Sequence, residues 1–115
     1  IGRHRPTVLS LVPTMLLRML RSNKLETADL KSVRSLWHLA APCPDWVKRG
    51  WIERLGAEKV NELWAATELT GVTVINGREW LQKPGSVGKG YATAIRSLDE
   101  ARRAAVVFWP NFWTR

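Results

Sequence analysis

Hydrophobic and polar positions recur along this chain with two different periods, which predicts an alternation of helices and strands. In "LVPTMLLRML" the apolar residues Leu16, Leu17 and Leu20 are spaced for one face of a helix, and basic residues fall on another face. Pro13 precedes them, as is common at the first position of a helix. The pattern predicts a helix over residues 13–21.

A second helix is predicted in "CPDWVKRGWIERLG". Val47, Trp51 and Leu55 share one face at helical spacing. Asp45 near the start suits the positive end of the helix dipole, and Gly56 is a typical stop. Thr27 and Asp29 are candidate caps for a further short helix upstream.

Short apolar or β-branched segments lie between these helices and predict strands. They are residues 36–41, the end of "EKVNELWAA", the segment "GVTVING" and "YATAIRSL". The second half of "REWLQKPGSVGKG" is typical of a loop. Alternating helices and strands indicate an α/β fold with a mixed, mostly parallel sheet and flanking helices.

The net charge of +8 would suit nucleic acid, an anionic substrate or an acidic partner. The 18 Lys and Arg residues, however, are scattered along the chain in runs of at most two. A nucleic-acid interface would be better indicated by a basic stripe or a named motif. We therefore expect a solvated basic surface.

Cys43 is the only cysteine, so an internal disulfide is excluded. His38 lies five residues before it and could in principle activate a thiolate nucleophile. The favoured interpretation is a small buried thiol beside prolines. No signal-peptide pattern opens the chain, and its apolar runs are shorter than the ~20 residues of a membrane span. A soluble, cytoplasmic protein is the expectation.

Thr67 and Glu68 stand side by side where the apolar segment "LWAA" ends. In open α/β sheets, ligands bind at the turns that follow the carboxyl ends of strands. A hydroxyl can bond a phosphate oxygen, and a carboxylate can hold Mg²⁺, which prefers oxygen ligands and keeps substrate phosphates in its shell. The alternative is a capping Thr beside a solvated Glu.

The segment "GSVGKG" from Gly85 invites comparison with a phosphate-binding P-loop. Its glycine spacing is two residues too short, and Gly90 stands where that motif requires Ser or Thr. A P-loop NTPase is therefore rejected.

Three segments in this order, "AAPCP", "WAATELTG" and "PGSVGKG", resemble the adenylate-forming superfamily of acyl-CoA synthetases, luciferases and peptide-synthetase adenylation domains. The helix segment "LVPTMLLRML" is similar as well. "EWLQKPGSVGK" resembles acyl-CoA synthetases of the fatty-acid and bile-acid or sterol-acid type. The resemblance covers about residues 1–90, as part of the large N-terminal domain.

The resemblance assigns roles to residues of two segments. Ala40, Ala41 and Pro42 match the Gly/Ala-Ala-Pro segment that lines one side of the adenine pocket. The second segment is an aromatic-Gly-x-Thr-Glu motif. Trp64, Ala65, Ala66, Thr67 and Glu68 match it, with Ala65 in place of Gly. By the resemblance, Trp64 would stack on adenine, Thr67 would contact the phosphates, and Glu68 would help to bind Mg²⁺.

By the same resemblance, Gly85 to Lys89 would form a structural loop of that domain. A complete enzyme of the family would use ATP, Mg²⁺ and coenzyme A to turn a carboxylic acid into an acyl-adenylate and then an acyl-CoA. Thr67 and Glu68 would be this chain's share of the catalytic groups.

Several family features have no counterpart in this sequence. They are the Ser/Thr/Gly-rich phosphate loop, the Asp that binds the ribose, the hinge, and the C-terminal domain with its adenylation Lys. Residues 91–115 diverge from the family and end in "ARRAAVVFWPNFWTR". A shifted reading frame would produce such a tail, and the alternative is a genuine apolar docking segment through which the chain associates. We expect this chain to be inactive alone.

A second class of function is a small basic protein that binds nucleic acid or an acidic partner. Seven tryptophans with a +8 charge would allow bases to stack while basic side chains follow the phosphates. Trp37, Trp51 and Trp64 lie in apolar segments and are more simply core residues. The adenylate-forming hypothesis is favoured.

Overall fold

The computed structural model describes residues 3–65, 67, 68 and 71–91, and these form a five-stranded sheet with helices. The elements in chain order are β1 (Val8–Leu11), α1 (Pro13–Leu20), the short 3₁₀ helix η1 (Asn23–Leu25), β2 (Ser35–His38), α2 (Asp45–Leu55), β3 (Val60–Ala65), β4 (Val72–Asn76), α3 (Gly77–Gln82) and β5 (Lys89–Gly90). The strands lie in the sheet in the same order as in the chain.

The sheet is mixed, as the sequence predicted. β1 pairs with β2 and β2 with β3 in parallel, whereas β4 pairs antiparallel with both β3 and β5. Parallel pairing requires a crossover, and helices α1 and α2 provide the two crossovers. The described sheet thus has as many antiparallel as parallel pairs.

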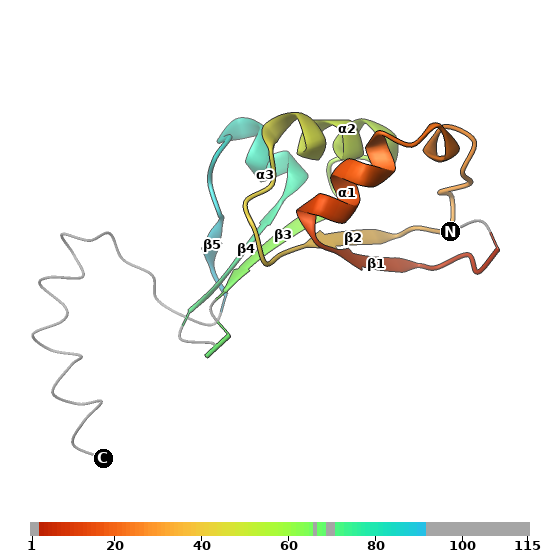
Figure 1. Cartoon of the computed structure of the whole chain (residues 1–115). Coiled ribbons are helices and arrows are strands. Elements are labelled where there is room, and N and C mark those ends of the chain that lie inside the picture. Colours follow the sequence, from red (N-terminus) through yellow and green to blue (C-terminus); the bar gives the residue numbers. More distant parts are fainter. Residues whose placement is uncertain (1–2, 66, 69–70, 92–115) are drawn as a thin grey trace, which may run out of the picture.

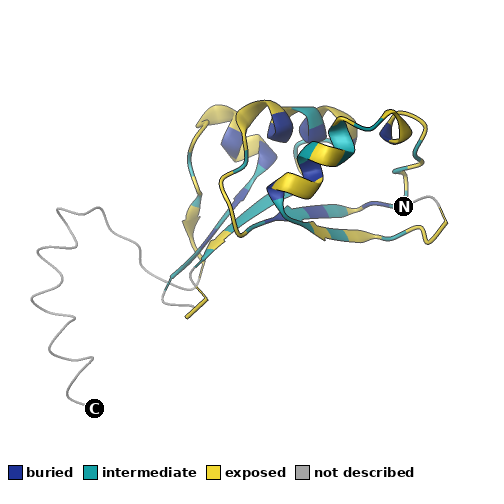
Figure 2. Ribbon diagram, viewed as in Figure 1, coloured by how far each residue is buried: buried dark blue, intermediate teal, exposed yellow. Residues whose placement is uncertain are grey.

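The three α-helices lie over the same face of the sheet (Figure 1). Along β2, Leu36 and His38 are buried, whereas Ser35 and Trp37, which alternate with them, are half-buried. This alternation follows from the period of two in a strand, with one face against the helices. Figure 2 shows the buried positions of the helices turned toward the sheet.

The core lies between the helices and the sheet. Leu16 of α1, Leu36 of β2 and Val60 of β3 are fully buried, together with Trp51 of α2. The indole Nε1 of Trp51 donates a hydrogen bond to the backbone carbonyl of Leu16 at 3.2 Å. This bond satisfies a buried donor and joins α1 to α2.

Both predicted long helices are confirmed to within one residue. α2 begins at Asp45 and ends at Leu55, and Gly56 follows with φ of 96°, which a side chain would disfavour. Val47, Trp51 and Leu55 are buried on one face of this helix, as their spacing predicted. Among the described residues, no helix combines the length and the apolar character needed to cross a bilayer.

Two predictions about local structure are wrong. The helix capped by Thr27 or Asp29 does not form: the structure has η1 just upstream, and the Asp29 carboxylate accepts a hydrogen bond from the amide of Lys31 instead. Such local bonds from Asp to its own backbone compete with helix formation. The strand expected over 36–41 ends at His38, and Ala40 and Ala41 lie exposed in the loop that follows.

Candidate functional site

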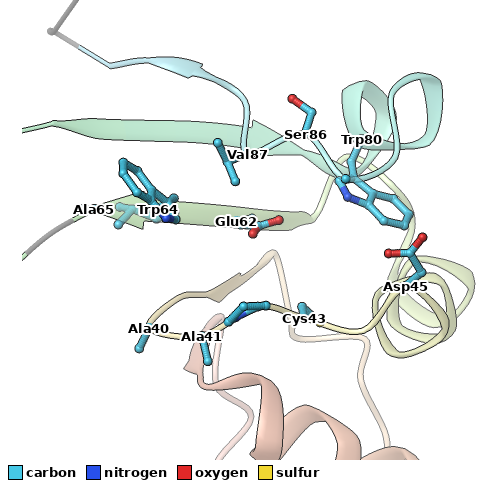
Figure 3. Close-up of a pocket in the computed structure, with 13 residues that line it drawn as sticks. Ala40, Ala41, Cys43, Asp45, Glu62, Trp64, Ala65, Trp80, Ser86 and Val87 are labelled. Atoms are coloured by element: carbon cyan, nitrogen blue, oxygen red, sulfur yellow. The ribbon is translucent and has the colours of Figure 1, made fainter. Parts of the chain in front are cut away.

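A cavity of about 350 Å³ opens between the loop after β2 and strand β3. This volume falls in the range of roughly 300–1,000 Å³ that is usual for small-molecule sites. Figure 3 shows its walls. The lining residues are Ala40, Ala41, Pro42, Cys43, Asp45, Glu62, Leu63, Trp64, Ala65, Trp80, Gly85, Ser86 and Val87.

The first wall is the loop that leaves β2. Ala40 there has φ of 75°, in the left-handed region that alanine rarely adopts. The turn brings Ala40 and Ala41 to the wall of the cavity, opposite β3 (Figure 3). Because alanine side chains are short, a ligand can approach the backbone of this loop closely.

The second wall is the end of β3. Glu62 and Trp64 are two residues apart on a strand, so both point to the same face. The Trp64 side chain is 51% exposed and Glu62 only 14%. An aromatic face open to the cavity can stack on a planar ligand, and the carboxylate beside it can accept a hydrogen bond.

The third wall is formed by α3 and the loop after it, which contribute Trp80, Ser86 and Val87 to the lining (Figure 3). This loop approaches β4 so closely that a Cβ at Gly88 would lie 2.1 Å from the carbonyl oxygen of Val74. The predicted loop in "GSVGK" is therefore present, and Gly88, with φ of 93°, is needed for it.

Thr67 and Glu68 lie in the turn that follows β3, and both are exposed. Their placement after the strand, with an exposed Glu68, is as predicted. Ala66 between this turn and β3 lies outside the described residues, as do most of "YATAIRSL" and the whole of the tail from residue 101. Neither Thr67 nor Glu68 lines the cavity, whereas Ala65 just before them does.

Beneath the cavity, three titratable side chains from three elements meet. The ammonium of Lys48 in α2 donates to Oε2 of Glu62, and His38 Nε2 of β2 lies 3.8 Å from the same oxygen. Lys48 and His38 are fully buried. The Lys48 ammonium also lies 4.7 Å from the centre of the Trp80 ring, at cation–π distance.

Burial governs the protonation of this cluster. Desolvation lowers the pKa of His38 to about 4, against the opposing effect of Glu62, so the imidazole is neutral at pH 7. Desolvation likewise lowers the pKa of Lys48, while its hydrogen bond and charge interaction with Glu62 raise it. The buried ion pair thus depends on both partners being present.

Cys43 lines the same cavity, but its chemistry does not suit a nucleophile. Desolvation raises the pKa of its thiol to about 11. The thiol is therefore neutral at pH 7, and its hydrogen bond runs to the carbonyl of Pro44 at 3.8 Å. This supports the interpretation of Cys43 as a structural thiol.

The predicted proximity of the two alanine-rich segments is confirmed, because Ala41 and Trp64 line one cavity. Glu62, Lys48 and Trp80 were missed by sequence reasoning. For Glu62 a signal existed, since it lies two residues before Trp64 on the same predicted strand. For Lys48 the sequence predicted a solvent-exposed cation on the surface of the helix.

Comparison with known proteins identifies the family of this chain. A family model described as AMP-binding enzyme matches residues 1–106. The long-chain-fatty-acid–CoA ligase of Bacillus subtilis (strain 168) is 32% identical over 88 residues, which are 76% of this chain and 16% of that protein. The chain thus spans about a sixth of the length of this relative.

Solved structures show the same fold. The N-terminal domain of FACL13 from Mycobacterium tuberculosis aligns with a TM-score of 0.65 at 25% identity, over 77% of this chain and 22% of that chain. The amide bond synthetase McbA from Marinactinospora thermotolerans aligns with a TM-score of 0.65 at 25% identity, over 78% and 19%. The o-succinylbenzoate coenzyme A synthetase of Bacillus subtilis, solved in complex with AMP, aligns with a TM-score of 0.61 at 25% identity, over 78% and 18%.

The matched family, the CoA-ligase relative and the shared fold agree with the three ordered motifs and with the cavity that all three of them line. The chain belongs to the AMP-binding, adenylate-forming enzyme family.

Proposed function

We propose that this chain supplies the adenine-binding walls of an ATP-dependent acyl-CoA synthetase. The observation that carries the proposal is the cavity itself, which sets the Ala40–Pro42 loop against the exposed ring of Trp64. A planar base would stack on Trp64 and lie against the short side chains of Ala40 and Ala41. Ala65 would line the rim of the same pocket.

The carboxylate of Glu62 adds a polar group to this pocket. An ionised carboxylate only accepts hydrogen bonds, so it favours a ligand edge that carries an N–H donor. The exocyclic amino group of adenine is such a donor. AMP should therefore bind more tightly than inosine monophosphate, which has a carbonyl oxygen at that position.

Thr67 and Glu68, in the exposed turn after β3, would contact the part of the nucleotide that extends from the adenine base. In the proposal Thr67 contacts the phosphates and Glu68 helps to hold Mg²⁺. Over the described residues there is no group of three His, Cys, Asp or Glu side chains that could hold a metal ion. This fits Mg²⁺, since that ion commonly takes one or two carboxylates and completes its shell with phosphates and water.

The proposed reaction is that of the family, carried out in the cytoplasm. A carboxylic acid of the fatty or sterol-acid class would be activated by ATP to an acyl-adenylate and passed to coenzyme A. Residues 1–90 would be part of the adenylation domain, and residues 91–115 a divergent tail. Support comes from the CoA-ligase relative and from the AMP complex among the structural neighbours.

Of the five tryptophans that the structure describes, Trp46 and Trp64 are the exposed ones, and Trp64 already has a place in the proposed adenine pocket. Trp51 and Trp80 are buried, at 0% and 3% exposure, so their rings are not available to stack on bases. Trp37 is half-buried in β2. We do not carry the nucleic-acid hypothesis forward.

The proposal is tested by titrating AMP into the wild-type chain and two tryptophan variants, with ligand-detected NMR as the readout. Trp64→Ala should weaken AMP binding at least about fivefold, because stacking of a base on an aromatic ring is worth roughly 1–3 kcal/mol. Trp46→Ala is the matched control: its side chain is also 51% exposed but does not line the cavity. Equal loss in both variants, or no binding by the wild type, would contradict the proposal.

A further inference from the structure

Lys48 is fully buried in the middle of the fold, which is unusual for a lysine. Burying a charge is costly unless it is paired and hydrogen-bonded. Its position in α2 places the ammonium directly beneath the cavity that Glu62 lines. Such a costly group beside a candidate site calls for an explanation beyond packing.

The contacts of Lys48 converge on the cavity. Its ammonium donates to Oε2 of Glu62 and lies 4.7 Å from the ring centre of Trp80, a second lining residue. Within residues 3–65, 67, 68 and 71–91, the other oxygen of Glu62, Oε1, has no hydrogen-bond partner. One carboxylate oxygen is therefore held from below and the other is left for a ligand.

We propose that Lys48 is a positioning residue of this pocket: it binds one oxygen of Glu62 from beneath, and thereby keeps the carboxylate ionised with its second oxygen available to the ligand. The inference rests on the proposed function in taking that ligand to be a nucleotide. Lys48 itself is buried and acts on the ligand only through Glu62.

The other titratable groups around the ion pair, His38, Cys43 and Asp45, are not cations that could pair with the Glu62 carboxylate in place of Lys48. His38 from β2 is neutral, since burial lowers its pKa to about 4. Cys43 from the loop is neutral, since burial raises its pKa to about 11. Asp45 at the start of α2 carries the same charge as Glu62 and cannot hold it. Lys48, whose ammonium donates to Oε2, is therefore the cationic partner of this carboxylate.

The test measures AMP affinity between pH 6 and 9 in a His38→Leu background. That background is needed because an imidazolium could replace the ammonium once Lys48 is lost. Leucine suits the site, since neither ring nitrogen of His38 has a hydrogen-bond partner in the part of the chain that the structure describes. The Lys48→Met variant keeps the aliphatic bulk and removes the charge.

Removing the adjacent positive charge favours the protonated form of the Glu62 carboxyl, and the share of this form increases as the pH falls. Relative to His38→Leu alone, the His38→Leu/Lys48→Met variant should then bind AMP roughly tenfold more weakly at pH 6, with affinity recovering toward pH 9. The ratio to the background removes the titration of the AMP phosphate, which is common to both proteins. A pH-independent ratio would overturn the inference.

A second comparison covers the case in which Lys48→Met alone does not fold. Glu62→Gln and Glu62→Gln/Lys48→Met should bind AMP nearly equally, because the carboxylate through which Lys48 acts is then gone and its remaining contact with the lining is the Trp80 ring. A further severalfold loss in the double variant would overturn the inference by showing that Lys48 shapes the pocket directly. Absence of AMP binding by the wild type would contradict the proposed function as well, whereas binding without coupling would contradict the inference alone.

Discussion

Ala40 has a backbone conformation that is unfavourable for any residue with a Cβ, and it lies in the wall of the cavity. A left-handed φ costs an L-residue roughly 1–2 kcal/mol. Strain of this kind persists where the surrounding structure enforces it, and it is frequent at ligand sites. Here it sets the turn by which the loop after β2 reaches the cavity.

Ala40→Gly should therefore stabilise the fold. Relief of the strain outweighs the larger entropy of glycine in the unfolded chain, for a net gain of about 0.5–1 kcal/mol in the free energy of unfolding. The measurement is urea denaturation followed by tryptophan fluorescence. Ala41→Gly is the matched control, because positive φ among the described residues other than glycine occurs only at Arg5 and Ala40. That control should lose stability, and a loss in both variants would contradict the strain argument.

His38 should make the protein sensitive to acid. Its folded pKa of about 4 lies below its usual value of 6.5, so the unfolded chain binds the proton more readily between these two values. The stabilisation is complete above pH 6.5 and is lost as the pH falls toward 4, by about 3 kcal/mol.

The measurement is the free energy of unfolding of wild type and His38→Leu at several pH values from 7 to 4. Carboxylates contribute an acid slope to both proteins, so the difference between the two curves isolates the imidazole. We expect the wild type to lose stability more steeply than the variant. Parallel curves would show that His38 does not titrate differently on folding.

Among the residues that line the cavity, the sequence predicted those that lie in short contiguous motifs. Ala40, Ala41 and Trp64 lie in short motifs, and they line the cavity. Lys48 and Glu62, 14 positions apart in sequence, come together only because α2 packs against β3 in the fold. Nothing in the local pattern around Lys48 distinguishes a lysine that turns inward from one in solvent.

At the scale of elements, α3 is fixed by its first turn. The Asn76 side chain accepts from the amide of Glu79, and the Glu79 carboxylate accepts from the amide of Asn76, which is a complete capping box. The helix has six residues and presents Trp80 to the core and the cavity. So short a helix depends on such capping, because helix nucleation is unfavourable.

Asn76→Ala should lower the free energy of unfolding by about 1 kcal/mol, through the loss of the N-cap acceptor. Asn76→Asp is the matched variant, since aspartate caps about as well as asparagine and should leave stability nearly unchanged. Urea denaturation of the three proteins gives the comparison. A loss of similar size in both variants would place the effect in the packing of Asn76 and not in its cap.

The elements were predictable where periodicity and end signals agreed. α1 and α2 each have an apolar face with a clear start, and both were placed correctly. α3 was missed because its six residues are too few to show a helical period, although Asn76 and Glu79 have the spacing of a capping box. The error at Thr27 and Asp29 arose because the same residue types favour turns and caps.

For the molecule as a whole, we predict that this chain alone does not catalyse adenylation. The phosphate loop, the ribose-binding Asp and the adenylation Lys of the family have no counterpart in its sequence. Each positioned donor of this kind is commonly worth roughly 3 kcal/mol in the transition state. A base pocket binds the ground state and the transition state about equally, so it cannot replace them.

The measurement is acid-dependent exchange of labelled pyrophosphate into ATP, with a panel of fatty and sterol-type acids and a full-length acyl-CoA ligase as positive control. No exchange above background is expected from the 115-residue chain. Exchange that disappears in Glu68→Ala would contradict the prediction and would show that this turn suffices for chemistry.

The strand order of the sheet also bears on how the fold can be reached during synthesis. Strands β1 to β5 lie in the sheet in the order in which they leave the ribosome. Each strand that the structure describes after β1 therefore pairs with the one made just before it. Loop closure between such neighbours costs little entropy, which favours fast folding. A nascent chain of this design can add to its sheet one strand at a time, in the direction of translation.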